Sequence, residues 1–203
     1  WTPRMKGKRS LGVVHHHILE VASRTYAGRV RQARNLLVGT YAEDGAHAQG
    51  NKAKALAAYT ERRRLIVITP LVTHNGAVEA TKTLPISGYN GIPHLLMPQG
   101  MWEECEERFR VELGAWSSGE RVIAIAQTDP PRRGDGSLAA EVIDLGLMWV
   151  TKDWIPVESG YEAIVAEKLI SEDRIFEKPL RFDSSEATFP DFLLKDTGSR
   201  TPL

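Results

Sequence analysis

The chain has 203 residues, and 42% of its side chains are hydrophobic, which is enough apolar surface for one sizeable core or two smaller ones. Lys plus Arg and Asp plus Glu number 26 each, so only a local patch can favour a polyanionic partner. The single cysteine excludes an internal disulfide, and no apolar run reaches the roughly 18 residues that a membrane span needs. A cytoplasmic setting therefore fits best. Because the first residue is Trp rather than Met, we expect the chain to be a piece of a longer protein.

The first third of the chain is predicted to be mainly helical. Ser10 suits the N-cap of a long helix that runs to about Leu37, because apolar residues recur at steps of three and four from Leu11 onward. Gly28 interrupts this pattern, so two helices with a joint at that residue are the alternative. A Gly-rich loop follows, and residues 51–64 form the second predicted helix.

Strand patterns begin at residue 65. Apolar runs at 65–72 and 77–86 flank an Asn-Gly pair, the strongest short-range signal of a β-hairpin. Residues 98–116 are predicted to form a third helix, with Pro98 in its first turn and one apolar face. The remaining predicted elements are strands at 121–129 and 140–152, a helix at 157–173, and strands at 176–182 and 191–196.

These elements predict an α+β fold with a mixed sheet. Residues 1–97 form an N-terminal portion of helices and a β-hairpin, and residues 98–203 form a mixed sheet flanked by helices. The two portions either fold as separate domains or pack as one.

Two noticeable features predict no chemistry. The consecutive residues His15, His16 and His17 point about 100° apart on a helix, so they cannot hold one metal ion together. Cys105 lies on the apolar face of its predicted helix, where a thiol behaves as a small hydrophobic group rather than as a nucleophile.

Glu162 and Asp191 are the candidate catalytic and metal-binding residues. On a helical wheel Glu162 falls beside Ala166 in the buried stripe, and a buried carboxylate is costly unless it is paired or bound to a metal. A pair with Arg174 or Lys178 is the alternative for Glu162. Asp191 follows a proline and opens an apolar strand, which places it at a strand end near this helix, although such an aspartate is also common in a strand-entry turn. Two carboxylates at one sheet edge suit a hard cation such as Mg²⁺.

Basic clusters in the first third, and two cations on the strand between the candidate carboxylates, are the candidate contacts to nucleic-acid phosphates. The alternatives are a solvated helix surface for the clusters and solvated edge charges for the strand cations. The candidate nucleic-acid-binding residues are Arg4, Lys6, Lys8, Arg9, Arg62, Arg63, Arg64, Lys178 and Arg181.

The order of a helix with an inner Glu, a strand, and a strand that opens with Pro-Asp resembles the front half of the PD-(D/E)xK nuclease superfamily. The resemblance implies a restriction-endonuclease-like fold toward the C-terminus, with Asp191 as the motif aspartate and Glu162 as the helix carboxylate of a magnesium site. The Glu-x-Lys of that motif is missing. A third strand is expected near Thr201, so the missing motif would lie beyond Leu203 in a longer parent, and the fragment itself would be inactive.

A second resemblance covers most of the chain. The segments WTPRMKGKRS, WIPVESGYEAIVAEKL, FEKPLRFDSS and FPDFLLKDT, in this order, resemble a bacterial family catalogued as domain of unknown function 1173. That resemblance implies carriage on plasmids and integrative elements, and an internal or C-terminal-region fragment of a longer protein.

The leading functional hypothesis is a magnesium-dependent nuclease-like module of a mobile-element protein. DNA is the candidate partner, and the sequence leaves DNA and RNA open as the substrate. The alternative is a noncatalytic nucleic-acid-binding or assembly module. A third reading is a structural or oligomerising domain in which the five Trp residues anchor cores and interfaces.

Overall fold

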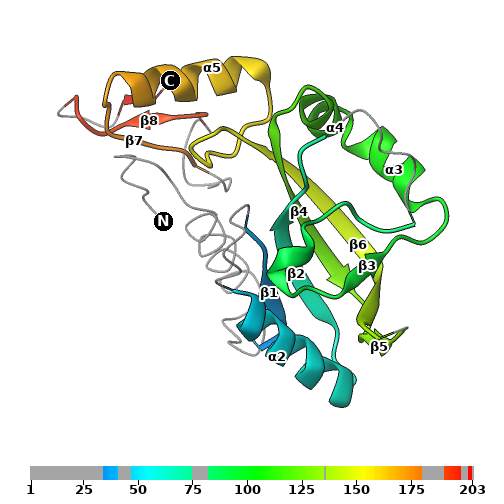
Figure 1. Cartoon of the computed structure of the whole chain (residues 1–203). Helices are drawn as coiled ribbons and strands as arrows, with labels where there is room; N and C mark the ends of the chain where they lie inside the picture. The colour runs from blue at the N-terminus through cyan, green and yellow to red at the C-terminus, as the bar shows by residue number, and fades with distance from the viewer. Residues whose placement is uncertain are drawn as a thin grey trace. The chain divides into compact units, whose positions relative to one another are not determined.

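The computed structural model describes residues 34–40, 47–74, 82–134, 136–179, 190–197 and 201–202. The described chain forms two compact units, divided between Trp149 and Val150 (Figure 1). We call them the sheet unit, which ends at Trp149, and the helix-strand unit, which begins at Val150. Helices and strands occur in both, so the predicted α+β class is confirmed. No helix in the described ranges is long and apolar enough to cross a membrane.

The sheet unit is built on a six-stranded mixed sheet with the order β1-β2-β4-β6-β3, and with β5 also paired to β6. β1 runs parallel to β2, β2 antiparallel to β4, and β3 parallel to β6. Strands from both expected portions of the chain, residues 1–97 and 98–203, therefore share one sheet. The bounds are β1 (Leu36–Val38), β2 (Leu65–Pro70), β3 (His94–Leu96), β4 (Arg121–Thr128), β5 (Arg132–Arg133) and β6 (Leu138–Val150).

Helices α2 (Ala48–Thr60), α3 (Met101–Arg108) and α4 (Arg110–Ser117) and the 3₁₀ turn η2 (Gly88–Asn90) accompany this sheet. The core draws on alternate residues of the central strands, such as Val122 and Ala124, together with Ala58 of α2 and Trp116 of α4. Trp116 is anchored further, because its indole N–H donates to the Val72 carbonyl at 2.7 Å.

The free edge of β1 is covered by side chains of α2. Asn51 accepts from the Val38 N–H at 3.2 Å and donates to the Val38 carbonyl at 2.7 Å, while the Lys54 ammonium donates to the Leu36 carbonyl at 3.1 Å. Asn51 also donates to the backbone carbonyl of Asn90 at 2.8 Å. Both asparagines are almost fully buried, so these contacts satisfy polar groups that water does not reach.

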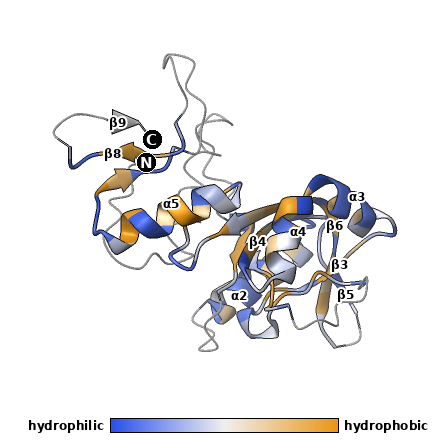
Figure 2. Cartoon of the chain, turned by 90° about the horizontal axis from the view of Figure 1, so that it is seen from above, coloured by the Kyte–Doolittle hydropathy of each residue, from blue (hydrophilic) through white to orange (hydrophobic). Residues whose placement is uncertain are grey.

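The helix-strand unit contains α5 (Gly160–Ser171) and a three-stranded antiparallel sheet in the order β7-β8-β9. The strands are β7 (Phe176–Glu177), β8 (Leu193–Leu194) and β9 (Thr201–Pro202), so the strand expected near Thr201 is confirmed. Phe176 and Phe192 are buried and meet edge to face, with ring centroids 5.6 Å apart. Figure 2 shows the hydrophobic colour of β8 beside the mixed colours of α5.

Three sequence predictions for the sheet unit are wrong in detail. Residues 36–38 are a strand rather than the end of a long helix, because the apolar run Leu-Leu-Val finds β2 as a partner. The predicted third helix is two helices, α3 and α4, which meet at Phe109, where φ is −117° and ψ is 40°.

The third correction concerns the predicted hairpin. β1 and β4 occupy the two edges of β2, and residues 82–86 pair with the β3 region, where the Leu84 N–H donates to the Leu95 carbonyl at 2.8 Å. They meet the preceding run at an isolated antiparallel bridge between Leu71 and Ile86. The Asn-Gly turn itself, like residues 1–33, lies outside the described residues.

We predict that Gly39→Ala destabilises the sheet unit. A Cβ at residue 39 would lie 1.9 Å from the hydroxyl oxygen of Thr69, a fully buried side chain on the neighbouring strand. The expected loss in the free energy of unfolding is about 1–3 kcal/mol, measured by urea denaturation. Gly114→Ala is the matched control, because nothing lies within 4 Å of its added Cβ in α4 and stability should rise by about 0.5–1 kcal/mol. Equal effects of the two substitutions would contradict this account.

Candidate functional site

The N-terminus of α5 fixes the position of Glu162. Ser159 is the N-cap, and its hydroxyl accepts from the Glu162 N–H at 3.2 Å, while Glu162 Oε2 accepts from the Glu158 N–H at 3.4 Å. A Ser followed three residues later by a Glu that bonds back to the preceding backbone forms a variant of the capping box. The prediction that Glu162 faces inward is confirmed, since the residue is only 9% exposed.

Lys178 lies directly after β7 and supplies the countercharge of Glu162. Its ammonium donates to Glu162 Oε2 in a buried ion pair, and only 7% of the Lys178 side chain is exposed. Of the two cations considered as partners for Glu162, the structure therefore selects Lys178. The alternative of a solvated edge charge does not hold for Lys178, because its long side chain is buried.

Asp191, which lies just before β8, contacts the same ammonium. Asp191 Oδ1 lies 3.8 Å from Lys178 Nζ, and the Asp191 side chain is 59% exposed. The next residue, Phe192, places its ring centroid 5.0 Å from the same Nζ, so a cation–π contact adds to the two ion pairs. Glu162 and Asp191, 29 positions apart in the chain, therefore converge on one cationic group.

We call Glu162, Lys178 and Asp191 the acid–lysine cluster. The cluster offers one buried and one solvent-facing carboxylate around a point that already holds a positive charge. Mg²⁺ is usually bound by one or two carboxylates together with water and substrate phosphate, so this donor set is compatible with such an ion. No group of three or more His, Cys, Asp or Glu side chains able to hold a metal occurs in the described ranges.

Two further ion pairs hold the strands around the cluster. The Arg174 guanidinium donates to both oxygens of Asp196 at 2.8 and 2.9 Å, and the Ile175 N–H donates to Asp196 Oδ2 at 3.0 Å. These hydrogen bonds, from Arg174 first, hold the pKa of Asp196 well below its usual range. Glu177 pairs with Lys195 across β7 and β8 at 2.8 Å.

The predicted basic residues divide between described and undescribed parts of the chain. Arg62, Arg63 and Arg64 lie in the connection between α2 and β2, where Arg62 and Arg64 are exposed and Arg63 is half-buried. The remaining predicted candidates Arg4, Lys6, Lys8, Arg9 and Arg181 lie outside the described residues.

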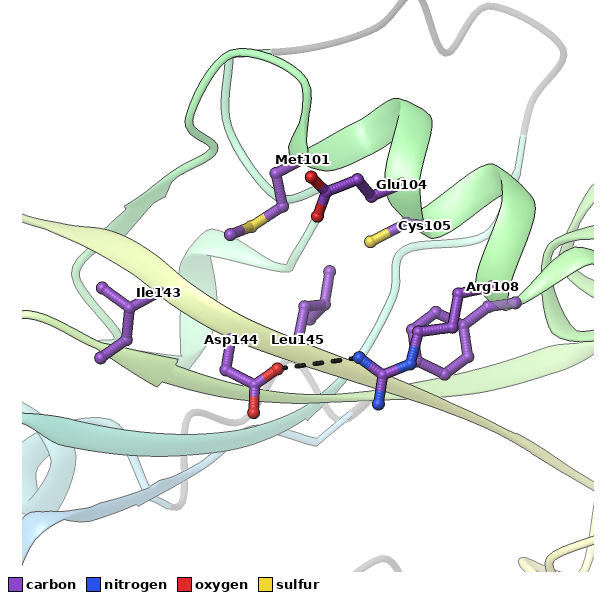
Figure 3. Close-up of a pocket in the computed structure, with 8 residues that line it drawn as sticks. Met101, Glu104, Cys105, Arg108, Ile143, Asp144 and Leu145 are labelled. Atoms are coloured by element: carbon purple, nitrogen blue, oxygen red, sulfur yellow. Dashed lines mark ion pairs between the residues drawn. The ribbon is translucent and has the colours of Figure 1, made fainter.

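The sheet unit contains a small hollow. Figure 3 shows it between α3 and β6, with Cys105, Arg108 and Asp144 among its lining residues. Its volume is about 80 Å³, below the roughly 300 Å³ that a pocket for a drug-sized ligand needs. Burial raises the pKa of the Cys105 thiol, so Cys105 is held in its unreactive protonated form, as the sequence suggested.

We predict that substitutions of Glu162 and Lys178 have non-additive effects on the free energy of unfolding. Glu162→Gln and Lys178→Met each leave one buried group without its partner, and each should cost about 3–5 kcal/mol in the free energy of unfolding. The double variant should cost less than the sum of the two, by about 1 kcal/mol or more in urea denaturation. Asp191→Asn, at an exposed position, is the control and should change stability by no more than about 0.5 kcal/mol. Additive single effects would rule out the buried pair.

We also predict that the ion pair of Arg174 and Asp196 makes the free energy of unfolding decrease at acid pH. Because the folded pKa of Asp196 is lowered, its contribution is present above the unfolded pKa of about 4 and is lost as pH falls. Between about pH 5 and pH 3 the urea midpoint of Asp196→Asn should therefore fall less than that of the unaltered chain. Arg174→Gln removes the larger cause of the lowered pKa but keeps the Ile175 N–H bond, so it should flatten the profile in the same direction and to a smaller extent. An unchanged acid profile in both variants would contradict this role.

Comparison with known proteins bears on identity rather than on chemistry. Neither the curated proteins nor the solved structures gave a match to this chain. One family model matches residues 1–203, the entire sequence, and its description is "Protein of unknown function (DUF1173)". The resemblance inferred from four sequence segments is therefore confirmed, and the chain belongs to the DUF1173 family.

Proposed function

We propose that the acid–lysine cluster is the phosphodiester-cleaving centre of a magnesium-dependent, nuclease-like module. The observation that carries the proposal is the convergence of Glu162 and Asp191 on the ammonium of Lys178. Helix α5 followed by the meander β7, β8 and β9 has the element order expected for the front half of a PD-(D/E)xK nuclease. This order supports the proposal but is an analogy of fold, which alone does not establish an activity.

A magnesium ion bound at this centre would polarise the scissile phosphate and supply a nucleophilic water at neutral pH. Asp191, which faces solvent, is the carboxylate that an incoming phosphate and its metal can reach. Glu162 holds Lys178 in place and limits the rotamers that its side chain can adopt. The ammonium of Lys178 is then fixed beside the place where negative charge would develop on the phosphate, which favours the transition state over the ground state.

The same geometry suggests where the lysine of such a site would come from. Lys178, directly after β7, reaches both carboxylates and so supplies a lysine ammonium at the proposed site.

The biological setting is part of this proposal. A mobile-element protein of the bacterial cytoplasm would meet DNA as its substrate, and a chain with one cysteine suits a reducing compartment. The competing noncatalytic reading is favoured by one observation: the described residues contain no cluster of three or more metal-ligating side chains.

The test is cleavage of supercoiled plasmid DNA by the full-length protein in the presence of magnesium chloride. Asp191→Ala should lower the cleavage rate by about 100-fold or more, because it removes a metal-binding and charge-positioning group. EDTA should abolish cleavage by the unaltered protein. Asp191 is the preferred probe because its exposed side chain contributes little to folding.

Glu167→Ala is the matched control. Glu167 is an exposed carboxylate of α5, the helix that also carries Glu162. It pairs with Lys152 at 3.8 Å and is not part of the acid–lysine cluster. Its cleavage rate should stay within about twofold of the unaltered protein. Cleavage that persists in Asp191→Ala, or DNA binding without any cleavage, would replace the nuclease proposal by the noncatalytic one.

A further inference from the structure

We propose that the sheet unit carries a separate surface that binds the phosphate backbone of nucleic acid. It consists of Arg62, Arg63, Arg64, Arg132 and Arg133, which we call the arginine patch. Arg132 and Arg133 were not among the sequence candidates, because they lie about 70 positions from the first three. The strand register is what joins the two groups.

Two contacts show that both runs lie at one end of the sheet. β2 begins at Leu65, immediately after Arg64, and Leu65 pairs with Thr128, the last residue of β4. Arg64 Nε lies 3.5 Å from Asp129 Oδ1, and β5 with Arg132 follows three residues later. Figure 1 shows β5 near the carboxyl end of α2, the helix that leads into Arg62.

An aromatic residue links the two runs directly. The guanidinium carbon of Arg133 lies 5.7 Å from the ring centroid of Tyr59 in the last turn of α2. This cation–π contact orients Arg133 over the start of the first run without neutralising its charge. The patch is thus a preformed arrangement on helix and strand ends rather than a chance grouping of side chains.

The charge of the patch is only partly compensated. Arg63 pairs with Glu61 at 2.7 Å, and Arg64 pairs with Asp129, but these are exposed or half-exposed contacts that salt weakens. Within the described ranges, Arg62, Arg132 and Arg133 have no carboxylate partner, and all three are exposed. Among the described residues, the five arginines of the patch form ion pairs with two carboxylates in all, so this part of the surface carries a local positive excess in a chain whose total charge is zero.

The chemistry of the patch favours phosphate as its ligand. Guanidinium groups are planar and bind phosphate oxygens through two parallel hydrogen bonds, which ammonium groups cannot do. Contacts of this kind are independent of base sequence and release condensed counterions, so they account for most nonspecific nucleic-acid affinity. The patch therefore fits the backbone of a nucleic acid, and it lies in a different unit from the acid–lysine cluster.

Fluorescence anisotropy of a labelled DNA duplex with the full chain tests this inference. The titration is performed in EDTA, so that metal-dependent cleavage cannot contribute to the signal. The result is therefore valid whether or not the nuclease proposal holds. With four to five phosphate contacts, affinity should fall by on the order of 100-fold between 50 and 200 mM salt. Glu167→Ala, which alters neither the arginine patch nor the acid–lysine cluster, should bind as the unaltered chain does.

The double variant Arg132→Gln/Arg133→Gln should bind about tenfold more weakly and reduce the salt slope by about two. The control Arg108→Gln/Arg110→Gln removes the same charge from exposed positions of α3 and α4 and should change affinity by no more than about twofold. Asp129→Asn tests the opposite sign. It releases Arg64 from its carboxylate partner, and affinity should rise severalfold.

Three outcomes would overturn the inference. These are equal losses in the patch and control doubles, an unchanged or lower affinity in Asp129→Asn, and binding to vesicles rich in phosphatidylserine or to poly-glutamate in preference to DNA. Thermal denaturation of each variant, with a midpoint near that of the unaltered chain, distinguishes lost contacts from lost folding.

Discussion

The buried ion pair of Glu162 and Lys178 is the interaction on which the helix-strand unit depends. A lysine ammonium inside a protein is costly unless a carboxylate neutralises it and hydrogen bonds satisfy the remaining groups. Here the carboxylate is held twice, by the ammonium and by the Glu158 N–H, at the first turn of α5. The pair therefore ties the start of a helix to the end of β7, two elements that local sequence preferences do not join.

This arrangement gives two carboxylates of similar chemistry very different exposure to solvent. Glu162 is buried and committed to its partner, whereas Asp191 faces solvent at a longer distance from the same ammonium. A substitution at Asp191 would therefore leave the buried ion pair of Glu162 and Lys178 in place. Sites with one buried and one accessible acid are also those in which environment assigns different roles to identical groups.

The sequence predicted the features that depend on local periodicity. The inward face of Glu162, the strand after Pro190 and the apolar strands β2, β4 and β6 all follow from residue spacing. The sequence offered both Arg174 and Lys178 as partners of Glu162 but did not decide between them, because β7 has only two residues and no period from which a face can be read. The start of β1 was also misread, since Leu36 and Leu37 continue a helical spacing and only pairing with β2 makes them a strand.

The arginine patch illustrates the same limit for function. Arg62 to Arg64 are conspicuous as a run, but Arg132 and Arg133 stand in a turn-rich segment and gain meaning only when Leu65 pairs with Thr128. A charge pattern along the chain therefore underestimates a surface that is assembled from two connections. The pairing of β2 with β4, which the composition does not reveal, determines how much positive charge gathers at this end of the sheet.

The polar contacts of α2 along β1 have a consequence for solubility. An outer strand whose N–H and C=O groups point to solvent is a template on which a second molecule can add its own strand. In this protein the carboxamide of Asn51 and the ammonium of Lys54 occupy those groups on Val38 and Leu36. The helix therefore satisfies backbone groups of β1 that would otherwise be open to pairing with a strand of another molecule, in addition to its contribution to the core.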